Sequence, residues 1–107
     1  MTAVAIMDWY SFDDGATLGH AGPEGGVTSR DEEYPLGARI TLEQGSRTEP
    51  FTITCGVYGL LMHTRFFGSR AGGERAYDAM KIGLVRVAEA EGRDFNAEAS
   101  AFVAQFP

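Results

Sequence analysis

The chain has 107 residues, of which 44% are apolar and 22% charged, and its formal net charge is −6. This size and composition predict one folded domain with a single core, spanning residues 1–107. The acidic balance and the single lysine exclude nucleic acid and anionic membrane surfaces as expected partners, and no apolar stretch is long enough to cross a bilayer.

Residues 2–12 are apolar with a mixed periodicity that suits a short helix or a strand, and we expect Trp9 to be buried. The start lacks the basic segment of a signal peptide, and one cysteine cannot form an internal disulfide. We therefore expect a cytoplasmic protein. Residues 13–26 contain five glycines and one proline, which predicts a loop long enough to be functional or mobile.

Residues 27–34 and 38–44 are expected to form a hairpin around a Tyr-Pro-Leu-Gly turn. The predicted register places Glu33 opposite Arg39. Charged and apolar side chains then share one side of the hairpin. This conflict predicts that 27–34 is an edge strand with charges pointing inward, a device that prevents sheet-to-sheet aggregation.

Residues 50–67 carry the strongest strand pattern in the chain. Two glycines bracket the predicted turn of a second hairpin, and the register that follows pairs Thr52 with His63. In that register His63 lies on the hydroxyl side, whereas Cys55 points the opposite way. Because residues 60–67 are apolar on both sides, we expect a central strand covered on both faces.

Residues 71–91 have apolar side chains at spacings of three and four, which predicts a helix with Glu74 in its first turn and Gly92 after its end. A second helix is predicted over 96–106, with Asn96 as its N-cap. Strands first and helices afterwards indicate an α+β fold. The expected architecture is an antiparallel sheet of about four strands, in two consecutive hairpins, with two C-terminal helices packed on one face.

The excess negative charge lies entirely in the first half of the chain. Residues 1–50 carry nine acidic and three basic residues, whereas residues 51–107 carry six of each. We therefore predict a non-enzymatic binding protein that presents an acidic surface to a basic protein partner. Compact acidic immunity and inhibitor proteins share this general character, which is an analogy of composition alone. The predicted partner-binding residues are Asp13, Asp14, Glu24, Asp31 and Glu33.

The alternative is a small enzyme or ligand-binding domain centred on His63. Histidine near neutral pH serves as a general acid or base, and Arg30, Glu32 and Arg65 are its expected companions. This function requires all four side chains to reach one pocket. A nucleophile pair with Cys55 is disfavoured because alternation along the strands separates the two side chains. An enzyme is therefore the less favoured interpretation.

No cofactor or metal is expected. His20 accompanies the acids of the glycine-rich segment, but their spacing matches neither a calcium loop nor a zinc site. The run from Gly68 to Gly73 lacks the lysine and hydroxyl ending of a phosphate-binding loop, so a turn before a helix explains its glycines. The apolar segment 60–67 also predicts a homodimer, because symmetric pairing would cover it.

Overall fold

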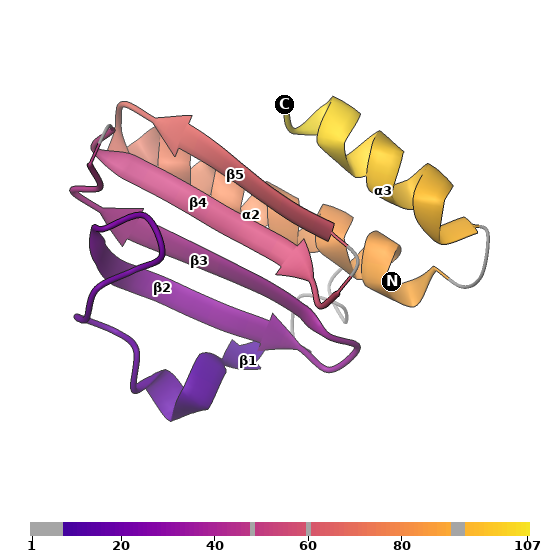
Figure 1. Ribbon diagram of the computed structural model, residues 1–107, viewed down its shortest axis with the longest axis horizontal. Helices are drawn as coiled ribbons and strands as arrows, with labels where there is room; N and C mark the ends of the chain where they lie inside the picture. The colour runs from indigo at the N-terminus through magenta and orange to yellow at the C-terminus, as the bar shows by residue number, and fades with distance from the viewer. Residues whose placement is uncertain (1–7, 48, 60, 91–93) are drawn as a thin grey trace.

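The structure is a computed structural model, and it describes residues 8–47, 49–59, 61–90 and 94–107. Its five-stranded antiparallel sheet follows the chain order, with helices on one face (Figure 1). The elements are β1 (Tyr10–Ser11), the single-turn 3-10 helix η1 (Phe12–Gly15), β2 (Val27–Tyr34), β3 (Ala38–Gln44), β4 (Phe51–Val57), β5 (Leu61–Phe67), α2 (Arg70–Glu89) and α3 (Asp94–Gln105). The α+β prediction is confirmed.

The fifth strand comes from the N-terminal segment, where Tyr10 and Ser11 pair with the end of β2. The described end of the predicted 2–12 element is therefore a short strand followed by η1, and residues 1–7 lie outside the described residues. Trp9 is buried, as expected. Because β1 covers only two positions, most of β2 is an edge strand, as the inward-pointing charges predicted.

The hairpin of β2 and β3 has the predicted register, with Glu33 opposite Arg39. Its turn closes with a hydrogen bond from the N–H of Gly37 to the carbonyl of Tyr34. Gly37 has a φ of 93°, which only glycine adopts without strain.

The predicted register of the second hairpin is wrong. The structure pairs Cys55 with His63 and Ile53 with Arg65, because β4 runs through Gly56 before the chain turns. The shift is odd, so every β5 side chain changes face relative to the prediction. His63 consequently lies on the same side of the sheet as Cys55.

The predicted position of β5 is also wrong. It is the edge strand of the sheet and not a central one, because β4 is its one strand neighbour in the described structure. Its apolar residues are correspondingly uncovered on one side, where Met62 and Phe66 are exposed.

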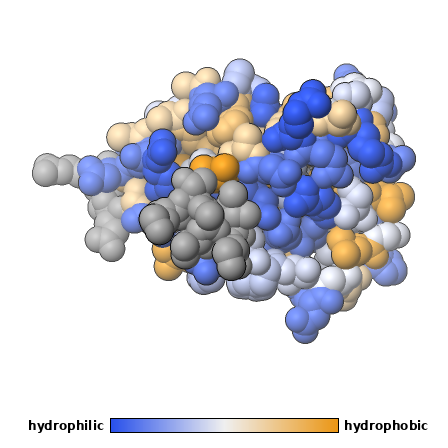
Figure 2. Space-filling view, turned by 180° about the vertical axis from the view of Figure 1, so that it is seen from behind, coloured by the Kyte–Doolittle hydropathy of each residue, from blue (hydrophilic) through white to orange (hydrophobic). Residues whose placement is uncertain are grey.

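The core lies between the sheet and α2. Ile40 and Ile53 of the sheet meet Tyr77, Met80 and Leu84 of the helix, and all five are fully buried. Burial of each aliphatic side chain contributes roughly 1.5–3 kcal/mol. Seen from the helix side, the surface is mixed, with hydrophilic residues over its centre and right and a paler, more apolar area at the upper left (Figure 2).

The helix termini differ in detail from the predictions. Ser69 caps α2 by accepting a hydrogen bond from the N–H of Gly72, and the helix begins at Arg70, so Glu74 lies beyond the first turn. The third helix begins at Asp94, which places Asn96 inside it and not at the N-cap. The predicted glycine after α2, at position 92, lies outside the described residues. None of the helices in the described residues is both long enough and apolar enough to cross a membrane.

Within the described residues, no α-helix covers the opposite face of the sheet. There, the glycine loop (residues 16–26) folds over the ends of β2 and β3. The carboxylate of Glu43 is fully buried beneath it and accepts hydrogen bonds from the main-chain N–H groups of Glu24 and Gly26. A Cβ at Gly22 would lie 2.8 Å from this carboxylate, which explains the need for glycine there.

Candidate functional site

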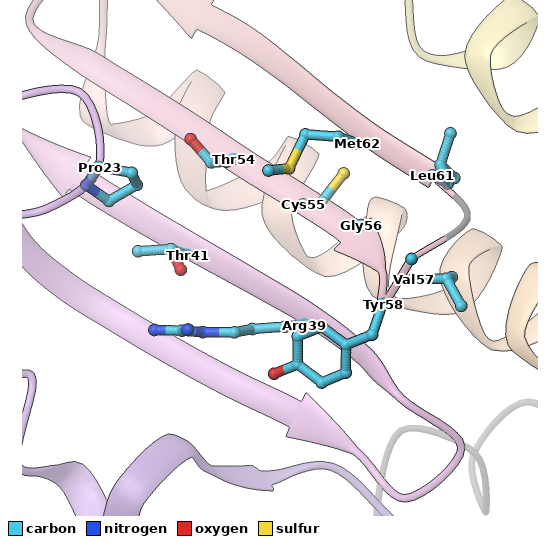
Figure 3. Close-up of a pocket in the computed structure, with 11 residues that line it drawn as sticks. Pro23, Arg39, Thr41, Thr54, Cys55, Gly56, Val57, Tyr58, Leu61 and Met62 are labelled. Atoms are coloured by element: carbon cyan, nitrogen blue, oxygen red, sulfur yellow. The ribbon is translucent and has the colours of Figure 1, made fainter.

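A trough of about 580 Å³ lies on the helix-free face of the sheet (Figure 3). Its size falls within the range of ligand pockets. The glycine loop borders one end, β3 and β4 form the floor, and the start of β5 forms a wall. The lining residues that shape it most are Pro23, Arg39, Thr41, Thr54, Tyr58 and Met62.

The guanidinium of Arg39 is held rigidly beside the trough. Its Nε and Nη2 donate to the two carboxylate oxygens of Asp31 at 3.0 and 2.8 Å, and its Cζ lies 3.5 Å from the centroid of the Phe12 ring. Hydrogen bonding to Asp31 raises the pKa of Arg39. Asp31 also accepts hydrogen bonds from Thr17 and Thr41, so its carboxylate is enclosed within the protein, whereas the Arg39 side chain stays 34% exposed beside the trough.

A second carboxylate, Glu33, lies at the rim of the trough. It accepts hydrogen bonds from the hydroxyls of Tyr58 at 2.6 Å and Tyr10 at 2.9 Å. Burial and the bond to Glu33 raise the pKa of Tyr58 to about 12, so the phenol stays protonated at neutral pH. The rim therefore presents one negative charge flanked by two neutral aromatic side chains.

The wall formed by β5 is apolar and open. The side chain of Met62 is 78% exposed and that of Phe66, farther along the strand, is 49% exposed. The hydroxyl of Thr54 is buried in the floor and has no hydrogen-bond partner among the described residues. The trough thus combines an apolar surface with a few polar groups, as binding sites do.

The residues of the predicted enzyme site form two separate clusters on the helix side. In the first, Glu32 accepts hydrogen bonds from Lys81 at 2.9 Å, Tyr77 at 2.9 Å and Arg30 at 3.3 Å. Arg30 also donates to Glu74 at 2.8 Å. Burial is the largest cause of the strongly raised pKa of Tyr77. These contacts join β2 to α2 and so help to hold the helix against the sheet.

The second cluster joins β5 to the end of the chain. His63 hydrogen bonds to the carbonyl of Phe106, and Arg65 donates to the carbonyl of Pro107 at 3.1 Å. Strand β5 lies three strand spacings from β2, or about 14 Å. His63 is therefore far beyond the ~3 Å reach of proton transfer to Glu32. Cys55 faces His63 across the strands, but burial raises its pKa to about 12, which suppresses the reactive thiolate.

The five predicted partner-binding acids differ in accessibility. Asp13 and Asp14 are exposed on η1 and both have left-handed backbone conformations. Glu33 and Glu24 are half-buried, and Asp31 is buried. The carboxylate of Asp31 is enclosed by Arg39 and two threonine hydroxyls, so it is the least accessible of the five.

Among the described residues, no cluster of histidine, cysteine and acidic side chains could hold a metal ion. His20 is exposed on the glycine loop. The chain matches no protein-family model, no curated protein and no solved structure.

Sequence reasoning missed the trough itself. Correct alternation along β3 and β4 would place Thr41 and Thr54 on one face, but Tyr58 and Met62 reach that face only in the observed register. The buried role of Glu43 had no sequence signal beyond its position on the polar side of a strand.

Proposed function

We propose that the protein is a non-enzymatic binding protein that receives a basic protein partner on its helix-free face. The observation that carries the proposal is the trough, with its exposed Met62 wall on one side and the Glu33 carboxylate at its rim. An apolar side chain of the partner would fill the trough, while basic side chains would face the acidic flank. The expected location is the cytoplasm.

The acidic flank consists of Asp13, Asp14 and Glu33. The hydroxyl of Tyr10 donates a hydrogen bond to Glu33, and the strand β1 that contains Tyr10 runs directly into η1, which carries Asp13 and Asp14. We therefore assign the three charges to the same side of the trough. Opposite charges on two proteins accelerate their encounter and lose that effect as salt rises. Asp31 is excluded from this set because it is neutralised internally.

Tyr58 is the expected energetic centre of the interface. It is exposed, and its ring borders the trough (Figure 3). Its hydroxyl donates a hydrogen bond to Glu33. Tyrosine is enriched among the few residues that dominate binding energy, because it offers a large rigid surface and a polar end. Met62 beside it supplies an adaptable apolar contact.

The test uses synthetic peptides that combine lysine or arginine with one leucine or phenylalanine, compared with acidic peptides of the same apolar content. Binding is measured by NMR, following the amides of Thr41, Thr54 and Met62. We expect the basic peptides to shift these signals, and the affinity to fall with salt. The double variant Asp13→Lys, Asp14→Lys and the variant Tyr58→Ala should each weaken binding.

Glu49→Lys is the control, because this exposed charge lies on the loop between β3 and β4 and not on the acidic flank. It should leave the peptide affinity unchanged. The proposal is wrong if the shifts occur elsewhere, if acidic peptides bind equally well, or if the flank variants bind like the control.

A further inference from the structure

Two arginines of this protein are held in the same way, each between an aromatic ring and a carboxylate. In the first of these units, the Cζ atom of Arg30 lies 4.0 Å from the centroid of the Tyr77 ring. The hydroxyl of Tyr77 donates to Glu32 at 2.9 Å, and Arg30 donates to the same carboxylate oxygen at 3.3 Å. The tyrosine thus holds the carboxylate beside its ring, where an arginine that stacks on the ring also reaches it.

The second unit uses a phenylalanine in place of the tyrosine. The Cζ atom of Arg39 lies 3.5 Å from the centroid of the Phe12 ring, while its Nε and Nη2 donate to Asp31. A guanidinium makes both contacts at once because its planar face stacks on a ring and its edges carry the N–H donors. The fold therefore contains two units of ring and carboxylate, and an arginine of the chain itself completes each of them.

Tyr58 and Glu33 form a third unit of this kind at the rim of the trough. The hydroxyl of Tyr58 donates to Glu33 at 2.6 Å, which repeats the pairing of Tyr77 with Glu32. Among the described residues, however, no arginine or lysine lies over the Tyr58 ring. In the described part of the chain, the face of this ring is thus not covered by a basic side chain.

The Tyr58 ring lies against the turn between β2 and β3. A Cβ at Gly37 would lie 3.6 Å from Cδ2 of the ring, and the main-chain N–H of Tyr58 donates to the carbonyl of Gly37 at 2.9 Å. Seen from the helix-free side, the ring is broadside to the viewer (Figure 3), and the residue is 53% exposed. The ring is therefore held in place with one face directed away from the sheet.

We propose that this third unit binds an arginine side chain of the basic partner, with the guanidinium stacked on the Tyr58 ring and donating to Glu33. This inference rests on the proposed function and names the basic side chain that the partner supplies. A carboxylate has about four acceptor positions. Glu33 uses two of them for Tyr58 and Tyr10, so it can accept further hydrogen bonds. Lysine fits less well, because its compact, strongly hydrated ammonium has no planar face to stack on a ring.

The local charge also favours a cation at this position. No basic side chain of the described residues forms an ion pair with Glu33. Arg39 is paired with Asp31 through two hydrogen bonds, and its guanidinium extends away from the Tyr58 ring (Figure 3). The charge of Glu33 therefore remains to attract a cation, beside the trough that accepts the apolar side chain of the same partner.

Matched peptides test the choice of arginine over lysine. The two peptides are acetylated and amidated, have the same length and contain one leucine, and they differ only in carrying two arginines or two lysines. NMR titration at low salt gives both affinities. We expect the arginine peptide to bind the wild type at least about threefold more tightly than the lysine peptide. Proton contacts between the arginine Cδ methylene and the ring of Tyr58 should accompany its binding.

The ratio of the two affinities is the decisive quantity, because a partly unfolded variant weakens both peptides equally. Tyr58→Leu removes the ring and should bring the ratio close to one. Tyr58→Phe keeps the ring but loses the hydroxyl that holds Glu33, so it should give an intermediate ratio. Phe66→Leu is the matched control and should retain the wild-type ratio. It removes an aromatic ring of similar exposure, 49%, from the same face of the sheet but outside the trough.

Equal affinity of the two peptides for the wild type would overturn this inference. The proposed function would survive that result if both peptides still shifted the amides of the trough. A ratio that Tyr58→Leu leaves unchanged, or that Phe66→Leu lowers to the same extent, would also overturn it. If neither basic peptide binds, the proposed function and this inference are both wrong.

Discussion

Removal of the Glu43 carboxylate should strongly destabilise the protein. In the described part of the chain, this fully buried group is bound by main-chain N–H donors and not by a basic side chain. Glu24 donates to both oxygens, at 3.1 and 3.0 Å, and Gly26 donates at 2.8 Å. These bonds fasten the glycine loop, including the Pro23 wall of the trough, to the end of β3.

The magnitude follows from the donors that Glu43→Ala leaves behind. Hydrogen bonds to a charged group contribute about 1.5–3 kcal/mol each, and a buried donor without a partner costs about 1–3 kcal/mol. The N–H of Gly26 is buried, whereas that of Glu24 is partly accessible and would regain water. We therefore expect a loss of about 3 kcal/mol in the free energy of unfolding, and a Tm lower by about 12 °C or more.

Urea unfolding followed by circular dichroism measures this loss. Glu43→Gln, which retains the volume and one acceptor oxygen, should cost about half as much. Glu49→Ala, at an exposed position, should change stability by less than about 0.5 kcal/mol. Hydrogen exchange should accelerate at Gly26 in the alanine variant. The reasoning is refuted if Glu43→Ala is as stable as the Glu49→Ala control.

Three further outcomes are expected. The thiol of Cys55, with its pKa raised to about 12, should resist iodoacetamide at pH 9 in the native protein and react in urea, as mass spectrometry would show; rapid native alkylation would contradict this. The folded-state pKa of Tyr58 is raised from 10.0 to about 12. The contribution of its protonated hydroxyl to folding stability is therefore complete below pH 10 and is lost as the pH rises through 12. Tyr58→Phe should remove that part of the alkaline destabilisation, measured as Tm against pH. Gly56→Ala should cost about 2 kcal/mol or more in urea unfolding, because the new Cβ meets the Leu61 carbonyl, whereas Gly68→Ala meets nothing and serves as its control.

The two hairpins show what turn chemistry can and cannot specify. In the first, one proline and one glycine define a single turn, and Gly37 has the positive φ that such a loop requires. In the second, two glycines compete. Gly59 has the positive φ of a turn. Gly56 lies inside β4, and glycine is needed there because the carbonyl of Leu61 leaves no room for a side chain. A sequence pattern cannot distinguish a glycine that is required for its positive φ from one that is required because a side chain would clash with a neighbouring atom.

That ambiguity determined most of the errors about the site. A register shift by an odd number of residues exchanges the two faces of a strand. His63 thereby moves from the hydroxyl-bearing face to the helix side, and Met62 moves to the face with the trough. The helices were more predictable, since their apolar period depends on one segment and not on the alignment of two.

The burial of charge could not be predicted from alternation for a different reason. Alternation correctly placed Asp31 and Glu33 on the side of β2 away from the helices, and such a side is ordinarily solvated. What covers it is the glycine loop and the Arg39 side chain, and a strand pattern carries no information about either. The internal use of Asp31 and Glu43 removes two of the nine acids in the first half from the surface. The salt dependence of partner association should therefore reflect the few charges of the acidic flank and be shallower than the net charge suggests.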